Sequence, residues 1–269
     1  MLVRVVAILA IVAAVAAACG GDGNERRDAV DEYVRAANTI QNRMRTQLTA
    51  ASQATRAFGT KKSDIQRARP RLARATRTLA KLERRLARLD PPPEARRLHG
   101  LLLELVALEG GLMDELRRVT VSLPQLDEAA RPVAAAGIRL QTQLRAAKSG
   151  GAQAGALDLY RSSLAAPLAA VRAIDPPPLL QPLRTTQLAT LTRLRATAAD
   201  LAAALRKRRE AQVTRLVQRF QAAARMADTT AAQRGRIAAI KSYNARVRRV
   251  STLAAKVQRE RDRLDRDLD

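Results

Sequence analysis

The stretch LARATRTLAKLERRLARLDPPP, residues 72–93, decides the expected fold. Its apolar residues recur at alternating steps of three and four, a spacing that places them on one face of an α-helix. These seam residues are Leu72, Ala75, Leu79, Leu82, Leu86 and Leu89. Asp90-Pro91-Pro92-Pro93 then ends the helix, because proline lacks the amide donor and forces the residue before it into an extended conformation. The stretch therefore predicts one arm of a helical hairpin that packs through a leucine seam.

A second copy of this design follows 85 residues later and ends at Asp175-Pro176-Pro177-Pro178. At this offset, apolar residues match on both sides of the prolines. The matched pairs are Leu72/Leu157, Leu79/Leu164, Leu86/Val171, Leu89/Ile174, Leu98/Leu183, Leu103/Leu188, Val106/Leu191 and Leu116/Leu201. We interpret residues 71–120 and 156–205 as a duplicated helix–Asp-Pro-Pro-Pro–helix hairpin. The alternative is two independent proline turns. We expect the prolines to be rigid corners, although pre-extended proline triplets can also be recognition sites.

The remaining sequence continues the helical pattern. A stripe over residues 30–58 predicts a first helix, and stripes from residue 94 and up to residue 268 predict a third and a last one. We expect about six helices in antiparallel hairpins with coiled-coil-like seams, an elongated all-α bundle over residues 28–269. A division into two domains near residues 149–154, around the expected loop Ser149-Gly150-Gly151, is the alternative.

Several irregularities interrupt this pattern. Pro124 and Pro132 predict a kink or break in the third helix, and Pro167 a kink in the second copy. The helix after Pro178 is expected to run unbroken to about Met226. Residues 259–269 alternate in charge, so we expect a solvated, fraying tip. Glu109 falls on the seam beside Gly110-Gly111, where the packing should loosen or leave a small gap.

The first nineteen residues, MLVRVVAILAIVAAVAAAC, combine Arg4, an apolar run too short for a comfortable membrane span, and three small residues before Cys19. A short Gly-rich segment follows. This arrangement resembles the lipobox of bacterial prolipoproteins, although Ala16 stands where leucine is that family's commonest residue. The resemblance implies a signal peptide over residues 1–18, cleavage between Ala18 and Cys19, and a diacylglyceryl group on the Cys19 thiol. An ordinary secretory signal and an uncleaved anchor are the alternatives.

The resemblance also implies a cellular location. It predicts a lipid-anchored protein on the extracytoplasmic face of the cell membrane, with residues 19–27 as a flexible tether. Cys19 is the only cysteine, so no disulfide can hold the body together, and helix packing must do so.

The chain carries 49 Lys and Arg against 25 Asp and Glu, a net charge of +24. Such a charge attracts anionic lipids or envelope polymers, or it reflects composition bias alone. Aromatic residues make up only 2% of the chain, and this scarcity disfavours nucleic acid as a partner. We expect a protein or an anionic envelope component as partner.

No residue pattern indicates catalysis. His99 is the only histidine, and Glu104 lies about 140° away from it around the helix, so the two do not form a metal-ligand face. The adjacent Asp114 and Glu115 point apart. We expect no enzyme, no cofactor and no metal, but a scaffolding, spacer or protein-interaction role at the envelope. The alternatives are a pocket for a small or lipidic ligand near Glu109-Gly110-Gly111, and binding of anionic polymers by basic helix faces.

Overall fold

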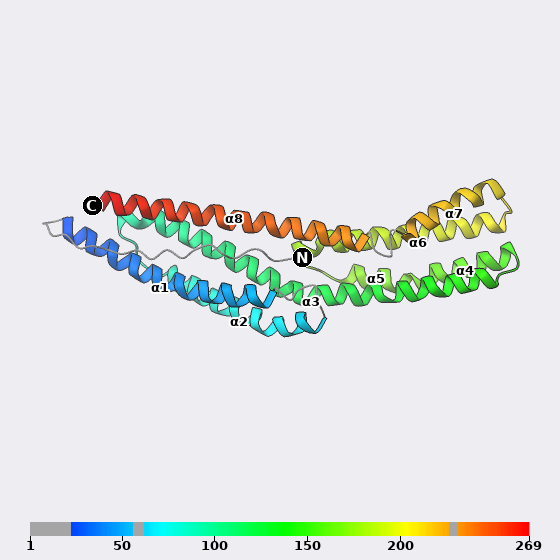
Figure 1. Cartoon of the computed structure of the whole chain (residues 1–269), viewed down its shortest axis with the longest axis horizontal. Coiled ribbons are helices and arrows are strands. Elements are labelled where there is room, and N and C mark those ends of the chain that lie inside the picture. Colours follow the sequence, from blue (N-terminus) through cyan, green and yellow to red (C-terminus); the bar gives the residue numbers. More distant parts are fainter. Residues whose placement is uncertain (1–22, 56–61, 226–230, 269) are drawn as a thin grey trace. The chain divides into compact units, whose positions relative to one another are not determined.

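The computed structural model describes residues 23–55, 62–225 and 231–268, which form helices and connecting turns with no strand among them (Figure 1). The prediction of an all-α helical bundle is confirmed. In chain order the elements are α1 (Gly23–Thr55), α2 (Lys62–Leu86), the 3-10 turn η1 (Pro93–Ala95), α3 (Arg96–Ala146), α4 (Gly150–Ser163), α5 (Ala165–Ala173), the 3-10 turn η2 (Pro178–Leu180), α6 (Gln181–Arg206), α7 (Glu210–Arg225) and α8 (Ala231–Leu268).

The chain divides into two compact units, and both boundaries fall inside helices. Unit 1 takes the described residues up to Thr120 and from Tyr243 onward, and unit 2 takes Val121–Ser242. Helices α3 and α8 therefore each contribute one part to each unit. This division differs from the split near residues 149–154 considered from the sequence. There, α4 already begins at Gly150, and the Ser149 hydroxyl caps it by accepting a hydrogen bond from the Ala152 amide at 3.2 Å.

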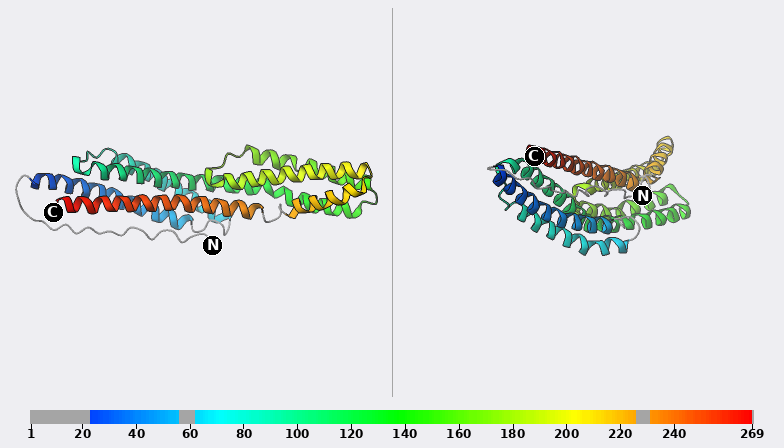
Figure 2. Two further views of the ribbon diagram at one scale, coloured as in Figure 1. Left: turned by 90° about the horizontal axis from the view of Figure 1, so that it is seen from above. Right: turned by 60° about the vertical axis from the view of Figure 1, so that its left-hand side comes forward.

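Unit 1 is a bundle of α1, α2, the first part of α3 and the second part of α8, which lie along one another (Figure 2). One hydrophobic cluster joins all four segments. The seam predicted over residues 72–86 is buried in it, with Leu72 and Leu86 both 0% exposed. The α1 stripe is buried as well, and Leu253, Val257 and Leu264 complete the cluster from α8. Phe58, the last residue of the predicted first stripe, lies outside the described residues.

Unit 2 is organised around α6, which packs against α4, α5 and α7. The side chains of Leu157, Leu164, Leu194 and Ala198 are buried in it. The Tyr160 and Phe220 rings meet edge to face, with centroids 5.8 Å apart, and join α4 to α7.

The residues paired by the predicted duplication have matching burial. In six matched pairs both members are buried, and in the other two, Leu89/Ile174 and Leu103/Leu188, both are partly buried. The six buried pairs are Leu72/Leu157, Leu79/Leu164, Leu86/Val171, Leu98/Leu183, Val106/Leu191 and Leu116/Leu201. Corresponding positions of the two copies therefore face the interior of their own units.

The prolines act differently from one site to the next. Pro124 and Pro132 lie inside the unbroken α3, so of the kink or break predicted there the break does not occur. Pro167 follows a real interruption: α4 ends at Ser163 and α5 begins at Ala165. A proline at 167 removes the amide that would bond the Ser163 carbonyl and crowds that carbonyl, so the helix breaks just before it.

Three other expectations are corrected. The predicted continuous helix to Met226 ends at Arg206, and α7 starts anew at Glu210. Residues 259–268 are not a fraying tip, because α8 extends through Leu268 and buries Glu260 and Leu264. Residues 23–27, expected in the tether, already belong to α1.

Candidate functional site

The predicted lipidation and cleavage residues, Ala18 and Cys19, lie outside the described residues. The described chain starts with α1 at Gly23, four positions after Cys19 in the sequence. Glu25 lies in the first turn of α1, where a carboxylate interacts favourably with the positive end of the helix dipole.

The two Asp-Pro-Pro-Pro turns have nearly the same backbone geometry. Pro92 has φ −59° and ψ 158°, and Pro177 has φ −60° and ψ 158°. In each copy the third proline starts a 3-10 turn, closed by a hydrogen bond from the Ala95 amide to the Pro92 carbonyl at 2.9 Å or from the Leu180 amide to the Pro177 carbonyl at 2.8 Å. Asp90 and Asp175, which precede the triplets, are both exposed. The shared geometry is what a duplicated corner requires.

Contacts in the second turn favour the interpretation as a rigid corner over that as a recognition site. Pro176 and Pro177 are buried. Gln181 donates to the Pro176 carbonyl at 3.0 Å, and Arg184 donates to the Val171 and Arg172 carbonyls at 3.3 and 2.8 Å. The two bonds from Arg184 satisfy carbonyls in the last turn of α5 that have no partner within the helix, and the bond from Gln181 holds the proline turn itself. The first turn is more open: Pro91 and Pro92 are partly buried, and Pro93 is exposed.

Near Glu109, where the sequence predicts a loosened seam or a small gap, one side of α3 packs into the core and another side is exposed to solvent. Leu105, Val106 and Met113 belong to the core cluster, so the seam continues past the glycines. Gly111 is exposed. A Cβ on Gly110 would lie 4.0 Å from Glu83 Oε2, so the carboxylate of α2 approaches α3 there. Burial raises the pKa of Glu109 from 4.5 to about 7, because the charged form loses hydration.

His99 contacts Tyr33 and not a carboxylate. Its Nδ1 lies 3.0 Å from the Tyr33 hydroxyl, and the two rings meet edge to face with centroids 5.9 Å apart. Burial lowers the pKa of His99 and raises that of Tyr33 to about 12, so both groups are neutral at pH 7. The hydroxyl and the ring nitrogen share one hydrogen bond, whose direction depends on the tautomer of His99. The pair joins α1 to α3 at the edge of the seam.

Asp114 and Glu115 point to different partners, as the sequence predicts. Asp114 accepts from Arg117 Nε at 2.9 Å on its own helix. Glu115 is 6% exposed and forms an ion pair with Arg246 of α8. A buried carboxylate needs such a partner, so Glu115 fastens α3 to α8 within unit 1.

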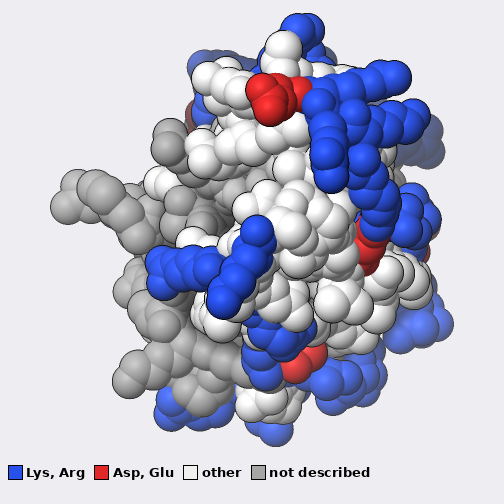
Figure 3. All heavy atoms as spheres, turned by 90° about the vertical axis from the view of Figure 1, so that its right-hand side faces the viewer, with Lys and Arg blue, Asp and Glu red and all other residues white. Residues whose placement is uncertain are grey.

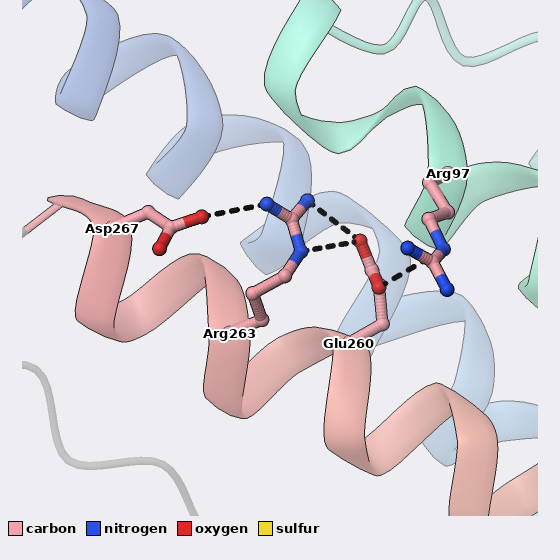
Figure 4. A network of polar contacts seen from close by, with 4 residues as sticks. All are labelled: Arg97, Glu260, Arg263 and Asp267. Carbon is pink, nitrogen blue, oxygen red and sulfur yellow. Dashed lines mark hydrogen bonds and ion pairs between the residues drawn. The ribbon is translucent and has the colours of Figure 1, made fainter.

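Sequence reasoning missed a second buried carboxylate, Glu260, which is the centre of a polar network (Figure 4). Its Oε2 lies 3.2 Å from Arg97 Nε of α3, and its Oε1 lies 2.7 Å from Arg263 Nη2. Arg263 also reaches Asp267 at 2.6 Å. The alternating charges of residues 259–269 were interpreted as solvated; the only available signal against this was Leu264, in step with Val257 along the α8 stripe.

Sequence reasoning also missed the turn between α6 and α7, where Arg206, the last residue of α6, is followed by three more basic residues, Lys207-Arg208-Arg209. The Arg208 amide bonds the Leu205 carbonyl at 3.3 Å, and the Arg209 amide bonds the Ala204 carbonyl at 3.2 Å. These two bonds form a Schellman motif, which ends a helix with a left-handed residue. Arg208 is that residue, with φ 50°, where glycine is usual. No glycine or proline marks the turn, and the basic run is its only signal.

The described residues contain no group of three or more His, Cys, Asp or Glu side chains that could hold a metal ion. No described helix has the length and apolar character that a membrane span requires. Comparison with protein-family models, with curated proteins and with solved structures finds no match to this chain.

Proposed function

We propose that this chain is a lipid-anchored protein on the extracytoplasmic face of the cell membrane, where its helical body acts as a scaffold, spacer or protein-interaction module. The observation that carries the proposal is Ala16-Ala17-Ala18-Cys19 after a basic start and a short apolar run. Cys19 is the only thiol in the chain and stands at the position that the lipobox resemblance assigns to the acylated residue.

The lipid anchor would hold the chain at the bilayer, and the segment between the lipidated residue and α1 would be short. Two acyl chains bury many methylenes, each contributing ~0.8 kcal/mol, so a diacylated chain stays at the bilayer. Only Gly20, Gly21 and Asp22 separate Cys19 from α1, which limits the distance between the lipidated residue and the helix to about 14 Å. The start of α1 would therefore lie near the headgroups, whatever conformation those three residues take.

The contacts of the most reactive side chains support a role without catalysis. A general base must face a substrate or a nucleophile, and His99, the only histidine, faces the Tyr33 hydroxyl. The buried carboxylates form ion pairs with arginines: Glu115 with Arg246 of α8, and Glu260 with Arg263 one turn further along α8. These groups stabilise helix packing in unit 1.

Labelling with a fatty acid, followed by mass spectrometry of the N-terminal peptide, tests the anchor. We expect a lipid on Cys19 and the protein in the membrane fraction. Cys19→Ser should lose both the label and the membrane association. Ala16→Leu is the matched control: it restores the commonest lipobox residue and should label at least as well as the wild type. A soluble, unmodified wild-type protein would contradict the proposal.

Crosslinking of the anchored protein in intact cells tests the interaction role. We expect crosslinked partners that are absent when Cys19→Ser releases the protein from the membrane. The same partners with both forms would show that the anchor does not determine the interaction. The ligand-pocket alternative receives no support at the glycines, since Gly111 is exposed and Met113 fills the seam beside it.

A further inference from the structure

One end of unit 2 carries a cluster of exposed cations from two turns. Arg145 and Lys148 lie at the α3–α4 turn, and Lys207, Arg208 and Arg209 at the α6–α7 turn; we call these five residues the basic tip. The two turns lie together, because a Cβ on Gly150 would be 3.5 Å from the Leu205 carbonyl (Figure 1). Viewed from this end, the surface carries many Lys and Arg side chains and few Asp and Glu (Figure 3).

The cations of the basic tip have no carboxylate partner among the described residues. Arg206, directly before the α6–α7 turn, is different, since it pairs with Asp158 of α4. The tip members form no such pair, and Arg209 contacts only the neutral Gln212, at 3.5 Å. Neither turn contains an acid, and Glu210, the first residue of α7, directly follows the second turn. Five cations against one carboxylate leave a strong local positive field.

The backbone at Arg208 supports a role for its side chain. A left-handed conformation costs an L-residue free energy that glycine does not lose, so glycine would suit the Schellman motif better. The chain has arginine at this strained position, with its side chain exposed. Strain at an exposed, charged residue is typical of positions that serve binding and not stability.

The chemistry of the tip favours phosphate groups on a polymer. Arginine, with its planar fork of donors, binds phosphate oxygens in a bidentate manner, and three of the five residues are arginines. A membrane-inserting surface would combine cations with apolar side chains. The exposed large apolar residues of the described chain, Ile138, Leu159 and Ile237, all lie outside the two turns. The turns also contain no aromatic residue, so bases of a nucleic acid would find no stacking platform.

We propose that the basic tip binds a phosphodiester polymer of the cell envelope. This inference rests on the proposed function for its location, since the anchor would hold the chain beside such polymers. The bound polymer and the acylated Cys19 would then make the protein a link between the membrane and an anionic layer.

Titration of the full chain in a neutral detergent with a synthetic poly(glycerol phosphate) tests the proposal. The tip variant combines Lys207→Gln, Arg208→Gln and Arg209→Gln. The control variant combines Arg74→Gln, Arg77→Gln and Lys81→Gln, which remove the same charge from exposed positions of α2 in unit 1. We expect the tip variant to weaken binding about tenfold or more, and the control to change it about twofold at most. The slope of log affinity against log salt should fall by about three in the tip variant alone.

Three outcomes would overturn the proposal: no binding by the wild type at low salt, equal losses in both variants, or tip-dependent binding to phosphatidylglycerol vesicles that exceeds binding to the polymer. Equal losses would indicate net charge without a site, and the vesicle result would assign the tip to a membrane. Circular dichroism of each variant shows that the fold is retained. Mass spectrometry of Cys19 on the same preparation tests the anchor separately, so failure of the tip and failure of the anchor are distinguishable.

Discussion

Glu109 is a carboxyl group placed where its charge is unfavourable. Burial raises its pKa in the folded state to about 7, from 4.5. The folded state therefore binds this proton more tightly than the unfolded chain does. The contribution of Glu109 to the free energy of unfolding is greatest below pH 4.5 and falls as the pH rises to about 7. After allowance for partial exposure, the loss amounts to about 2 kcal/mol.

Glu109→Gln should remove this dependence. We expect the variant to match the wild type at pH 5 and to exceed it by about 2 kcal/mol at pH 8, measured by urea unfolding. Glu104→Gln, which changes an exposed carboxylate on the same helix, should show no such difference. A constant difference between Glu109→Gln and the wild type at both pH values would show that ionisation of Glu109 is not coupled to folding.

Arg208 presents the opposite case, in which the backbone is strained and the side chain is free to solvent. We expect Arg208→Gly to raise the stability of unit 2 by about 1 kcal/mol, because glycine adopts a positive φ without steric cost. Arg208→Ala is the matched control: it removes the same charge, keeps the strain, and should leave stability nearly unchanged. Denaturant unfolding measures both. Equal gains from glycine and alanine would assign the effect to charge repulsion among the neighbouring cations instead.

At the scale of elements, predictions from the sequence succeeded where a helical repeat of apolar residues was long. They failed where a single residue determined whether a helix ends. The seam from Leu72 to Leu86 and its copy from Leu157 to Val171 are buried as predicted, because repeated leucines at helical spacing specify one face. The α6–α7 break was missed because an arginine takes the left-handed position. Of the kink or break predicted at Pro124 and Pro132 the break does not occur, and α3 continues through both prolines despite the two amide donors that they remove.

For the candidate site, too, the sequence predicted some features and not others. The sequence shows the positive charge of the basic run Arg206–Arg209. Its placement beside Arg145 and Lys148 depends on the packing of α4 on α6, which the sequence does not show. Charge alternation near residue 260 suggested a solvated tip, because sequence alone does not show that Arg97 of α3 lies opposite Glu260. Contacts between distant segments of the chain were therefore the part that periodicity could not supply.

Packing of α8 on α6 in unit 2 depends on the absence of a side chain at Gly235. This residue is buried, and a Cβ there would lie 2.8 Å from the Leu183 Cα. Because that atom belongs to the backbone of α6, the two helices would have to move apart. We expect Gly235→Ala to lower the free energy of unfolding by about 1–3 kcal/mol, despite the better helix propensity of alanine.

Gly137→Ala is the control for Gly235→Ala. A Cβ at Gly137, inside α3, meets nothing within 4 Å, so alanine should stabilise the helix by about 0.5–1 kcal/mol. Thermal unfolding followed by circular dichroism compares the two variants. A stabilising Gly235→Ala would show that α6 and α8 do not approach as closely in solution as their backbones indicate.

At the scale of the whole molecule, the two units share helices α3 and α8. The hydrophobic cluster of unit 1 draws its members from residues 33–113 and 253–264, and Leu194 of unit 2 is buried without belonging to this cluster. Net charge, by contrast, is divided evenly. Residues 121–242, which make up unit 2, contain 19 Lys and Arg against 7 Asp and Glu, a net +12, and the rest of the chain contains 30 against 18, also a net +12. Because the described cluster of unit 1 takes no residue from unit 2, we expect the two units to respond separately to substitutions in their interiors.

Matched core substitutions test this independence. Leu79 in unit 1 is 1% exposed and Leu194 in unit 2 is 0% exposed, so Leu→Ala at either position should cost about 2–5 kcal/mol. Hydrogen exchange followed by mass spectrometry reports the loss segment by segment. We expect Leu79→Ala to speed exchange in residues 62–120 and 243–268 and to leave 150–206 protected. Leu194→Ala should do the reverse. Because α3 and α8 continue from one unit into the other, equal acceleration throughout the chain would instead mean that these helices couple the units into one cooperative fold.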